Sequence, residues 1–214
     1  MVLRIGMVKI HRIQGDITPE IAESFKDSIA IDTEATGLQI PERDKLSLIQ
    51  ICGDNSDVYV IQPDRKAYKA PNLVSVLENE KILKIGHFLR FDKSALEYFL
   101  KCKMNNIFCT KISSKIVRTY TDKHGLKSLV QEFCNKSLDK RQGSSDWNKN
   151  ISELTDKQLE YAANDVIYLH KIHDELNKML KRESRIELYQ NCLKFLKTRV
   201  ELDLALFKED IWSH

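Results

Sequence analysis

The amino-acid sequence predicts an α/β fold in which a mixed β-sheet is flanked by α-helices. Short runs rich in β-branched residues fill the first 62 residues and are separated by turn residues. After about residue 72, apolar residues recur at helical spacing, and one further strand-like run lies between the first two expected helices. Strands followed by helices that alternate with a strand favour an α/β sandwich with a mixed sheet.

The expected strands are short, apolar and bounded by turn residues. They cover residues 7–13, 28–34, 46–52, 57–62 and 81–88. Between the third and the fourth of them, the turn-rich segment "GDNSD" predicts a hairpin-like connection. We therefore expect one sheet, built mainly from the N-terminal part of the chain.

The expected helices follow from apolar residues at helical spacing. They cover residues 72–79, 92–102, 109–120, 125–134 and a long segment that starts near residue 155. Thr155, followed three residues later by Gln158, has the spacing of a capping box, and it predicts that the last segment begins near Asp156. Residues 135–150 have little regularity and are expected to form a linker.

The composition indicates a single globular domain over residues 1–214. The chain is 42% hydrophobic and 30% charged, which suits a protein with a sizeable core. Its net charge of +3 is too small to indicate a long nucleic-acid groove. Because the sequence lacks both a run of roughly 18 apolar residues and the apolar core of a secretory signal, we expect a cytoplasmic protein without a membrane partner. Five scattered cysteines without a CxxC pair indicate neither a disulfide framework nor a zinc site.

Two carboxylates stand at the end of the second expected strand, in "SIAIDTEATGL". Side chains alternate across a strand, so Asp32 and Glu34 project to the same side if the strand persists through Thr33. Like charges at that range repel each other, and a bound cation relieves the repulsion. The alternative is a strand that ends in solvent with both acids hydrated, and this short pattern alone leaves it open.

Two further acids lie in patterns that are weak when taken singly. Tyr161 and Asp165 are four residues apart on the helix expected from Asp156, so they share one face of it. Their alternative is an ordinary amphipathic helix with a surface acid and a partly buried tyrosine. Asp92 falls near a helix start after a strand-like run, where the alternative is a capping acid stabilised by the helix dipole.

Taken together, these residues resemble the metal-binding set of the DEDD superfamily of 3′-5′ exonucleases, whose fold is ribonuclease H-like. In that superfamily, a DxE pair on a strand, an Asp of a second motif and an Asp of a third-motif helix converge on two divalent metals. The matching residues here are Asp32, Glu34, Asp92 and Asp165. Tyr161 in "YAAND" resembles the tyrosine subclass, which includes ribonuclease D.

Longer segments carry the resemblance further. The stretches "DTEATGL", "GHFLRFD", "FCTKISSKIVRTYTDKHGLK", "SSDW" and "LEYAANDVIYLH" together resemble the nanoRNase C family of compact ribonuclease D-like enzymes, which degrade dinucleotides. The resemblance implies a nuclease core at about residues 10–180 and a C-terminal helical segment at about 181–214. It also implies an exoribonuclease that releases nucleoside 5′-monophosphates from very short RNA, and a homo-oligomer, which in that family is an octameric ring.

The resemblance implies two divalent cations, Mg²⁺ or Mn²⁺, as cofactors. Hard oxygen ligands without His or Cys suit these ions far better than zinc. By resemblance, Asp32 would bridge the ions, and Glu34 and Asp165 would complete one of them. Asp92 would support the other ion. Tyr161 would orient the attacking water, since an unperturbed phenol has a pKa of about 10 and is neutral at pH 7.

Four further residues are candidate contacts to the substrate. Leu38 lies where the family places an apolar side chain between bases, although a turn leucine that covers the core also fits the sequence. His87 opens the second motif and could contact sugar or phosphate, with a structural histidine as the alternative. Arg118 and His124 belong to the densest basic region and could hold a 5′ phosphate, or form an ordinary solvated face.

Two kinds of alternative function remain open from the sequence. Within the same class, the chain could trim the 3′ ends of longer RNA as ribonuclease D does, or degrade DNA. A protein of a different class would be a catalytically inactive nucleic-acid-binding protein on the same fold. The complete acid set with Tyr161 favours an enzyme, because a binding module has no need to keep four mutually repelling acids.

Overall fold

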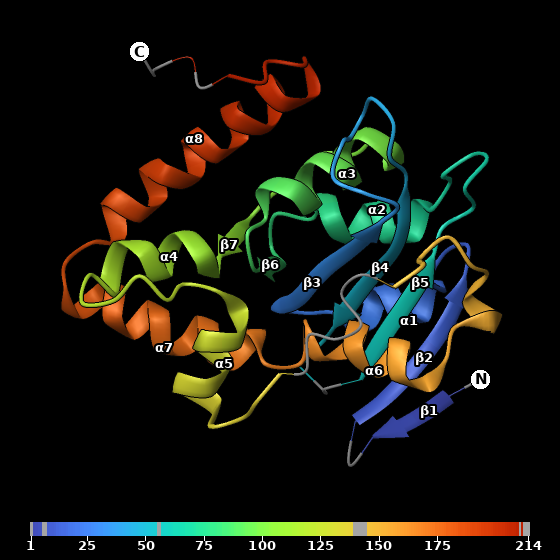
Figure 1. Ribbon diagram of the computed structural model, residues 1–214, viewed down its shortest axis with the longest axis horizontal. Coiled ribbons are helices and arrows are strands. Elements are labelled where there is room, and N and C mark those ends of the chain that lie inside the picture. Colours follow the sequence, from blue (N-terminus) through green and yellow to red (C-terminus); the bar gives the residue numbers. More distant parts are fainter. Residues whose placement is uncertain (1, 6–7, 55–56, 139–144, 210, 212–214) are drawn as a thin grey trace.

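The computed structural model describes residues 2–5, 8–54, 57–138, 145–209 and 211, and it contains a seven-stranded sheet (Figure 1). The strands are β1 (Val2–Ile5), β2 (Val8–Gln14), β3 (Ser28–Ala35), β4 (Leu46–Cys52), β5 (Val58–Gln62), β6 (Leu83–Gly86) and β7 (Ile107–Cys109). Their order across the sheet is β1-β2-β5-β4-β3-β6-β7. β4 is antiparallel to both of its neighbours, whereas β6 is parallel to both of its own. The predicted α/β class with a mixed sheet is therefore confirmed.

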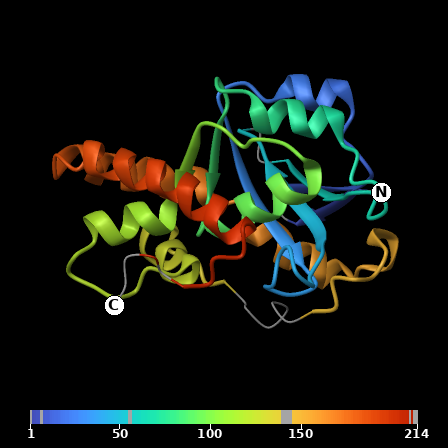
Figure 2. The ribbon, with the colours of Figure 1, turned by 90° about the horizontal axis from the view of Figure 1, so that it is seen from above.

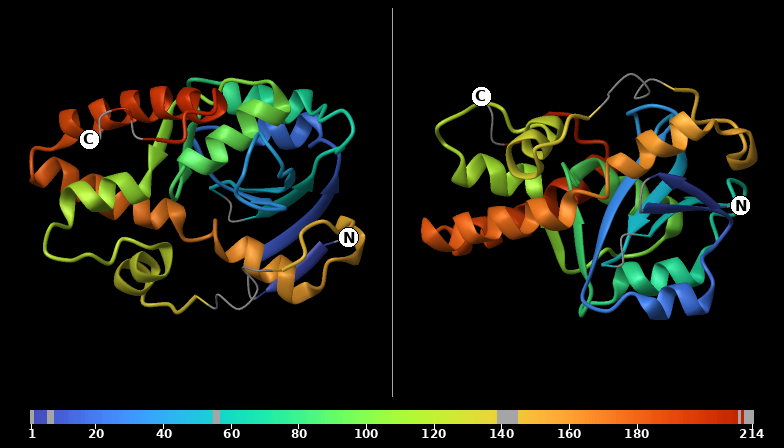
Figure 3. Two further views of the ribbon diagram at one scale, coloured as in Figure 1. Left: turned by 45° about the horizontal axis from the view of Figure 1, so that its top comes forward. Right: turned by 90° about the horizontal axis from the view of Figure 1, so that it is seen from below.

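Helices cover both faces of this sheet. They are α1 (Pro19–Ser24), α2 (Pro71–Glu78), α3 (Arg90–Leu100), α4 (Thr110–Val117), α5 (Leu126–Cys134), α6 (Asp156–Asn164), α7 (Leu169–Arg182) and α8 (Ile186–Leu204), with a short 3-10 helix η1 (Ile151–Glu153). Figure 2 shows α1 and α2 on one face and α6 on the other. Figure 3 shows α4, α5, α7 and α8 gathered beyond the β7 edge. Among the residues described, no helix combines the length and apolar character that a membrane crossing requires.

The hydrophobic core is divided by the sheet into two clusters. On one face, residues of α2, α3 and α8, such as Leu96, pack with Ile31 and Ile49. On the other face, residues of α5, α6 and α7, such as Leu159, pack with Leu48. Every residue of β4 is buried, because this strand lies between β3 and β5 and is covered on both sides. Burial of this kind supplies most of the free energy that holds the central strands in place.

Most predicted elements are confirmed, and the differences have local causes. The helix predicted over 109–120 begins one residue later, because Cys109 pairs in β7, and it ends at Val117. The short helix α1 was not predicted, although Thr18 caps its first turn. Residues 139–144 of the predicted linker lie outside the described residues.

The long helical segment predicted from residue 155 is divided into three helices, α6, α7 and α8. Its start is confirmed, because Thr155 and Gln158 make both hydrogen bonds of a capping box. The chain leaves the helix at Asp165 and enters α7 at Leu169. The helical character predicted for this segment agrees with the structure, and only the breaks between the helices were not predicted, because apolar spacing continues across them.

A group of charged side chains joins α8 to α3. Arg90, in the first turn of α3, donates two hydrogen bonds to the carboxylate of Asp203 at 2.6 and 2.7 Å. Arg199 donates to the same carboxylate at 2.8 Å. Burial alone would raise the pKa of Asp203, but the hydrogen bonds from the two guanidinium groups outweigh it and hold the pKa below its usual value. The pairing therefore fixes the C-terminal helix against the N-terminal turn of α3.

We predict that Asp203→Asn lowers the free energy of unfolding by about 1 to 3 kcal/mol at pH 7, because it weakens charge-assisted hydrogen bonds that are partly shielded from water. A carboxyl with a depressed folded-state pKa stabilises the fold above its ordinary pKa, and that contribution is lost as pH falls through the folded-state value. The stability gap between wild type and variant should therefore narrow below about pH 4 in urea unfolding experiments.

Glu42→Gln is a suitable control, because it removes another ion pair of the C-terminal segment that is more exposed, Glu42 with Lys208. Exposed pairs contribute about 0 to 1 kcal/mol, so the control should change stability little. Equal losses for Asp203→Asn and Glu42→Gln would contradict the structural role of Asp203.

Candidate active site

Three of the predicted acids meet at one place in the fold. Asp32 and Glu34 come from β3, and Asp165 follows the last residue of α6. One carboxylate oxygen from each of the three lies within 4.8 Å of the others. Asp165 is buried and the other two are half-buried. The strand runs extended through Thr33, so the predicted placement of Asp32 and Glu34 on one face agrees with the structure.

Asp165 reaches this group because α6 ends at Asn164. Asp165 itself keeps a helical backbone conformation and donates its N–H to the carbonyl of Ala163. A carboxylate at the C-terminal end of a helix faces the negative pole of the helix dipole, which disfavours its charge. Asp165 thus joins the two acids of β3 at the end of α6, where a bound cation would offset the repulsion among the three carboxylates.

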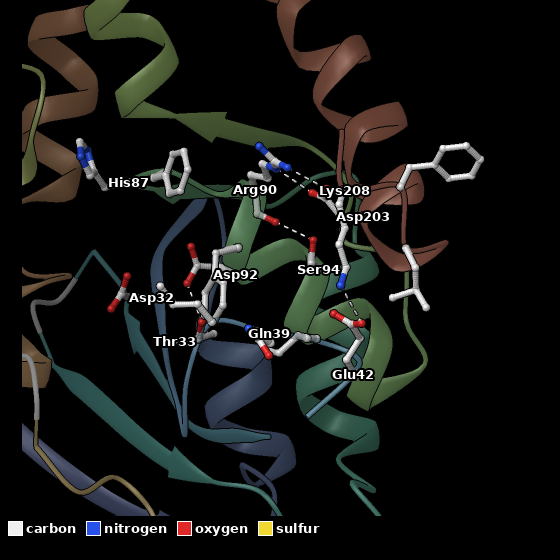
Figure 4. A pocket seen from close by; sticks show the side chains of 16 residues that line it. Asp32, Thr33, Gln39, Glu42, His87, Arg90, Asp92, Ser94, Asp203 and Lys208 are labelled. Atoms are coloured by element: carbon white, nitrogen blue, oxygen red, sulfur yellow. Dashed lines mark hydrogen bonds and ion pairs between the residues drawn. The ribbon is translucent and has the colours of Figure 1, made fainter. Parts of the chain in front are cut away.

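Asp92 approaches from the other side of β3 and is not part of the close group. It lies in the first turn of α3, is buried, and accepts a hydrogen bond of 2.6 Å from the hydroxyl of Thr33 (Figure 4). Burial raises the pKa of the Asp92 carboxyl to about 7, the hydrogen bond from Thr33 opposes that rise, and the charge of Asp165 adds to it. The fourth predicted acid is thus close enough to Asp165 to interact with it electrostatically.

The donor set fits a hard divalent cation. The three acids of the close group offer carboxylate oxygens only, and they belong to three separate side chains that converge within 4.8 Å. Oxygen donors of this kind suit Mg²⁺ and Mn²⁺, which prefer carboxylates and water over thiolate or imidazole.

Tyr161 lies over the acids, one turn before Asp165 on α6. Burial raises the pKa of its hydroxyl well above the usual value, and the charges of Asp165, Glu34 and Asp32 raise it further. The phenol is therefore protonated at neutral pH and can donate a hydrogen bond. Its ring lies 6.1 Å from that of Trp147, which is buried, so the structure gives Trp147 a packing role beside Tyr161.

A pocket of about 610 Å³ opens next to the acids. Asp32 and Asp92 line one part of it, as Figure 4 shows, and the segment that follows α8 lines another. Four of its lining residues are among the large apolar side chains most exposed to solvent, namely Leu38 at 83%, Phe88 at 51%, Leu206 at 50% and Phe207 at 53%. A pocket that combines acids with exposed apolar surface suits a ligand that has both phosphate and bases.

Leu38 is presented by a loop that Asp44 holds in shape. The Asp44 carboxylate accepts a hydrogen bond from the backbone N–H of Gln39 at 2.8 Å. It also lies so close to Gly37 that a Cβ there would approach it to 2.4 Å, so only glycine fits. With 83% of its surface exposed, Leu38 is not the core-covering leucine that the sequence left as an alternative.

His87 lies at the end of β6 and also lines the pocket. The Thr110 hydroxyl donates its single proton to the carbonyl of Gly86 at 3.1 Å. His87 Nδ1, 2.9 Å from the same hydroxyl, must therefore be the donor in that pair. This hydrogen bond fixes the orientation of the imidazole ring at the edge of the pocket.

The structure does not bring Arg118 and His124 into this pocket. Arg118 is buried, forms an ion pair with Glu132 and donates to the hydroxyl of Ser114 and the carbonyl of Lys123. It lines another pocket of about 600 Å³, which is formed by the turn after α4 and by α5. His124 Nδ1 lies 2.9 Å from the hydroxyl of Ser114. Both residues thus take part in packing the turn between these helices.

Three residues of the site were not predicted from the sequence. Thr33 was treated only as a spacer, yet its hydroxyl holds Asp92. Phe88 and Phe207 were not identified, although both are exposed aromatics in the pocket. Phe88 has a positive φ of 65°, which is unusual for a bulky residue, and no pattern in the sequence predicts it.

Known proteins match this chain over most of its length. A family model described as 3′-5′ exonuclease matches residues 16–181. Solved structures of Brucella melitensis NrnC are 42% identical to the chain and cover 96% of it and 98% of their own length. The one with bound Mg²⁺ has a TM-score of 0.87, and the one bound to pGG has a TM-score of 0.89.

Curated relatives are longer than this chain. Ribonuclease D of Gluconacetobacter diazotrophicus is 27% identical over 185 residues, which are 85% of this chain and 44% of that protein. DNA polymerase I of Aquifex aeolicus is 33% identical over 155 residues, which are 70% of this chain and 24% of that protein. The chain therefore spans less than half the length of these curated relatives.

We predict that Asp32→Asn removes most of the stabilisation that Mn²⁺ gives to the protein. The substitution relieves repulsion among the clustered acids, so the melting temperature in chelator should be unchanged or higher. With Mn²⁺ at about 100 times its Kd, the wild type should gain about 2.7 kcal/mol, and the variant less than about 1 kcal/mol. Thermal unfolding with Mn²⁺ and with chelator measures both effects.

Glu160→Gln is the matched control, because Glu160 is an exposed acid on α6 outside the cluster. It should respond to Mn²⁺ as the wild type does. Full Mn²⁺ stabilisation of Asp32→Asn would show that the Asp32 carboxylate is not a ligand.

Proposed function

This chain belongs to the 3′-5′ exonuclease family, as a DEDD-type and ribonuclease D-like member, and on that premise we propose that it is a metal-dependent exoribonuclease for very short RNA. Dinucleotides are its proposed main substrates, and nucleoside 5′-monophosphates are the products. The main support for this proposal is the composition of the pocket. The pocket lined by Asp32 and Asp92 is also lined by exposed apolar side chains, so phosphate chemistry and base binding can take place in one small space.

The size of the pocket and its walls support a short substrate. A volume of about 610 Å³ suits a small ligand better than a polymer. The segment after α8 contributes Leu206 and Phe207 as a wall, and α8 is fastened to α3 through Asp203 and Arg90. The NrnC structure bound to pGG, which is 42% identical to this chain, adds independent support.

In this mechanism, two divalent cations would stabilise the attacking and the leaving oxygen of an in-line displacement. Asp32, Glu34 and Asp165 are the residues that would hold one ion. By the family resemblance, Asp32 would also help to hold the other. Asp92, oriented by Thr33, would support the second. Tyr161, kept protonated by burial and by the neighbouring acids, would donate a hydrogen bond that orients the attacking water rather than remove its proton.

Base contacts would come from the apolar walls of the pocket. Leu38 would stand between the two bases, because its side chain projects from the loop almost fully exposed. Phe88 and Phe207 offer aromatic faces, and stacking on such faces binds bases without regard to their sequence. His87, with its ring fixed by Thr110, would contact sugar or phosphate at the pocket edge. Arg118 and His124 stay candidates only for a contact outside this pocket.

We also propose that the protein forms a homo-oligomer, with the octameric ring of the nanoRNase C resemblance as the specific assembly. Leu188 and Phe195 support an association surface, because they are exposed apolar residues seven positions apart on α8 and so share a face of that helix. Light scattering after size exclusion measures the mass of the assembly directly.

The test of the proposed function is a time course of RNA degradation. A 5′-labelled dinucleotide and a 5′-labelled heptanucleotide are incubated in separate tubes, each with Mn²⁺ or with chelator. We expect rapid, metal-dependent loss of the dinucleotide and slow attack on the longer RNA. Stepwise shortening of the longer RNA that stalls at short products would identify a 3′ trimming enzyme instead. Equal rates on DNA of the same lengths would point to a DNA exonuclease, and no turnover of any substrate would support an inactive binding protein.

We predict that Leu38→Ala weakens dinucleotide binding without a change in stability. The side chain is 83% exposed, so the free energy of unfolding should change by less than about 0.5 kcal/mol. Loss of the contact with bases should cost about 1 to 2 kcal/mol, which raises KM roughly 5- to 30-fold. Val2→Ala, at an exposed apolar position on β1 away from the pocket, should leave KM unchanged. An unchanged KM for Leu38→Ala would remove Leu38 from the substrate site.

A further inference from the structure

Gln50 is a buried polar residue in β4, the central strand of the sheet. Its side chain is completely buried. Neither its amide nitrogen Nε2 nor its oxygen Oε1 has a hydrogen-bond partner among the residues that the structure describes. A buried amide that lacks partners destabilises a fold, and most buried polar groups in proteins are paired. The presence of this amide in the central strand therefore calls for a reason other than stability.

The position of Gln50 in the sheet places it next to the acids. In the antiparallel pairing of β3 with β4, Gln50 lies directly opposite Asp32. On its other side it lies opposite Val60 of β5. Residues directly opposite each other project from the same face of a sheet, with their Cβ atoms about 5 Å apart. Gln50 therefore projects on the face from which Asp32 and Glu34 project, and α6, which carries Tyr161, packs against β4 and β5.

A second buried glutamine, Gln62 at the end of β5, shows how this protein uses such a side chain for structure. Gln62 Nε2 donates to the carbonyl of Lys149 at 2.8 Å. Its Oε1 accepts from the backbone N–H of Ile151 at 3.1 Å. Both ends of the Gln62 amide are thus occupied, and they hold η1 against the sheet. Gln50 differs from Gln62 because its amide is also buried, yet neither end of it is hydrogen-bonded within the described part of the chain.

We propose that Gln50 is a positioning residue of the metal site, an inference that rests on the proposed function. Its Nε2 donates a hydrogen bond to the Asp32 carboxylate in the cation-loaded protein and so fixes the orientation of that ligand. Carboxylates that bind metals are themselves commonly hydrogen-bonded, and a charge-assisted bond inside a protein is stronger than a neutral one. Gln50 thus provides Asp32 with a donor from the strand directly beside it.

The test is Gln50→Met, which keeps the length and approximate shape of the side chain but removes the amide. Two quantities are measured, the melting temperature in chelator and the Kd for Mn²⁺ by isothermal titration calorimetry. Because the Gln50 amide has no hydrogen-bond partner among the described residues, the melting temperature in chelator should be unchanged or higher. Loss of a group that orients a metal ligand should weaken Mn²⁺ binding about 10- to 100-fold.

Gln62→Met is the matched control. It removes a paired amide, so it should lower the melting temperature and leave the Kd for Mn²⁺ within about twofold of the wild type. If Gln50→Met also binds Mn²⁺ within twofold of the wild type, the proposal is overturned, whatever the melting temperature. If both variants lose affinity equally, the effect on Gln50→Met is a general loss of packing, and the proposal is again overturned.

Titration with the metal alone separates this inference from the proposed function. Wild-type protein that binds Mn²⁺ together with a Gln50→Met variant that binds it equally well would refute only the role of Gln50. Wild-type protein that fails to bind Mn²⁺ would refute the metal site itself, and with it both proposals. Activity of Gln50→Met that recovers as Mn²⁺ is raised would support a defect in metal binding rather than in chemistry.

Discussion

The mutual approach of Asp32, Glu34 and Asp165 is the constraint on which the rest of this structure depends. Their carboxylate oxygens converge within 4.8 Å, and like charges at that range repel strongly where water is partly excluded. Packing elsewhere must offset that repulsion, which explains why the acids stand on well-packed elements. β3 lies between β4 and β6, and α6 has an apolar face on the sheet. Metal binding and stability are consequently linked at this point.

Different local features of the fold place the acids at the site. Alternation along β3 puts Asp32 and Glu34 on one face and leaves Thr33 on the other, where its hydroxyl meets Asp92 from α3. The early end of α6 turns Asp165 inward instead of carrying it along a longer helix. The first turn of α3 is in turn fixed by α8, through the guanidinium of Arg90 and the carboxylate of Asp203. The C-terminal helix thus contributes to the site from a distance.

The sequence predicted those features that follow local rules. Two-residue spacing was enough to place Asp32 and Glu34 together, and the capping box located the start of α6. The approach of Asp165 depends on how α6 packs on the sheet, so only the family resemblance could supply it. The pocket could not be predicted, because no local sequence pattern connects Leu38 with Phe207. The two residues line the same pocket only because α8 packs beside it. The sequence shows Gln50 as a polar residue in an apolar strand. That its amide has no hydrogen-bond partner among the described residues depends on the tertiary structure and cannot be predicted from the sequence.

Three kinds of locally unfavourable feature coincide at this end of the sheet. The acids repel one another, Leu38 and its apolar neighbours in the pocket face water, and the Gln50 amide is buried without a partner in the described protein. None of them helps the chain to fold, and unrelated structural accidents would have no reason to occur together. Natural sequences break the rules of stability mainly where function requires it. Their coincidence is therefore a stronger argument for one functional centre than any of the three features alone, and the position of Gln50 directly opposite Asp32 supports its proposed role there.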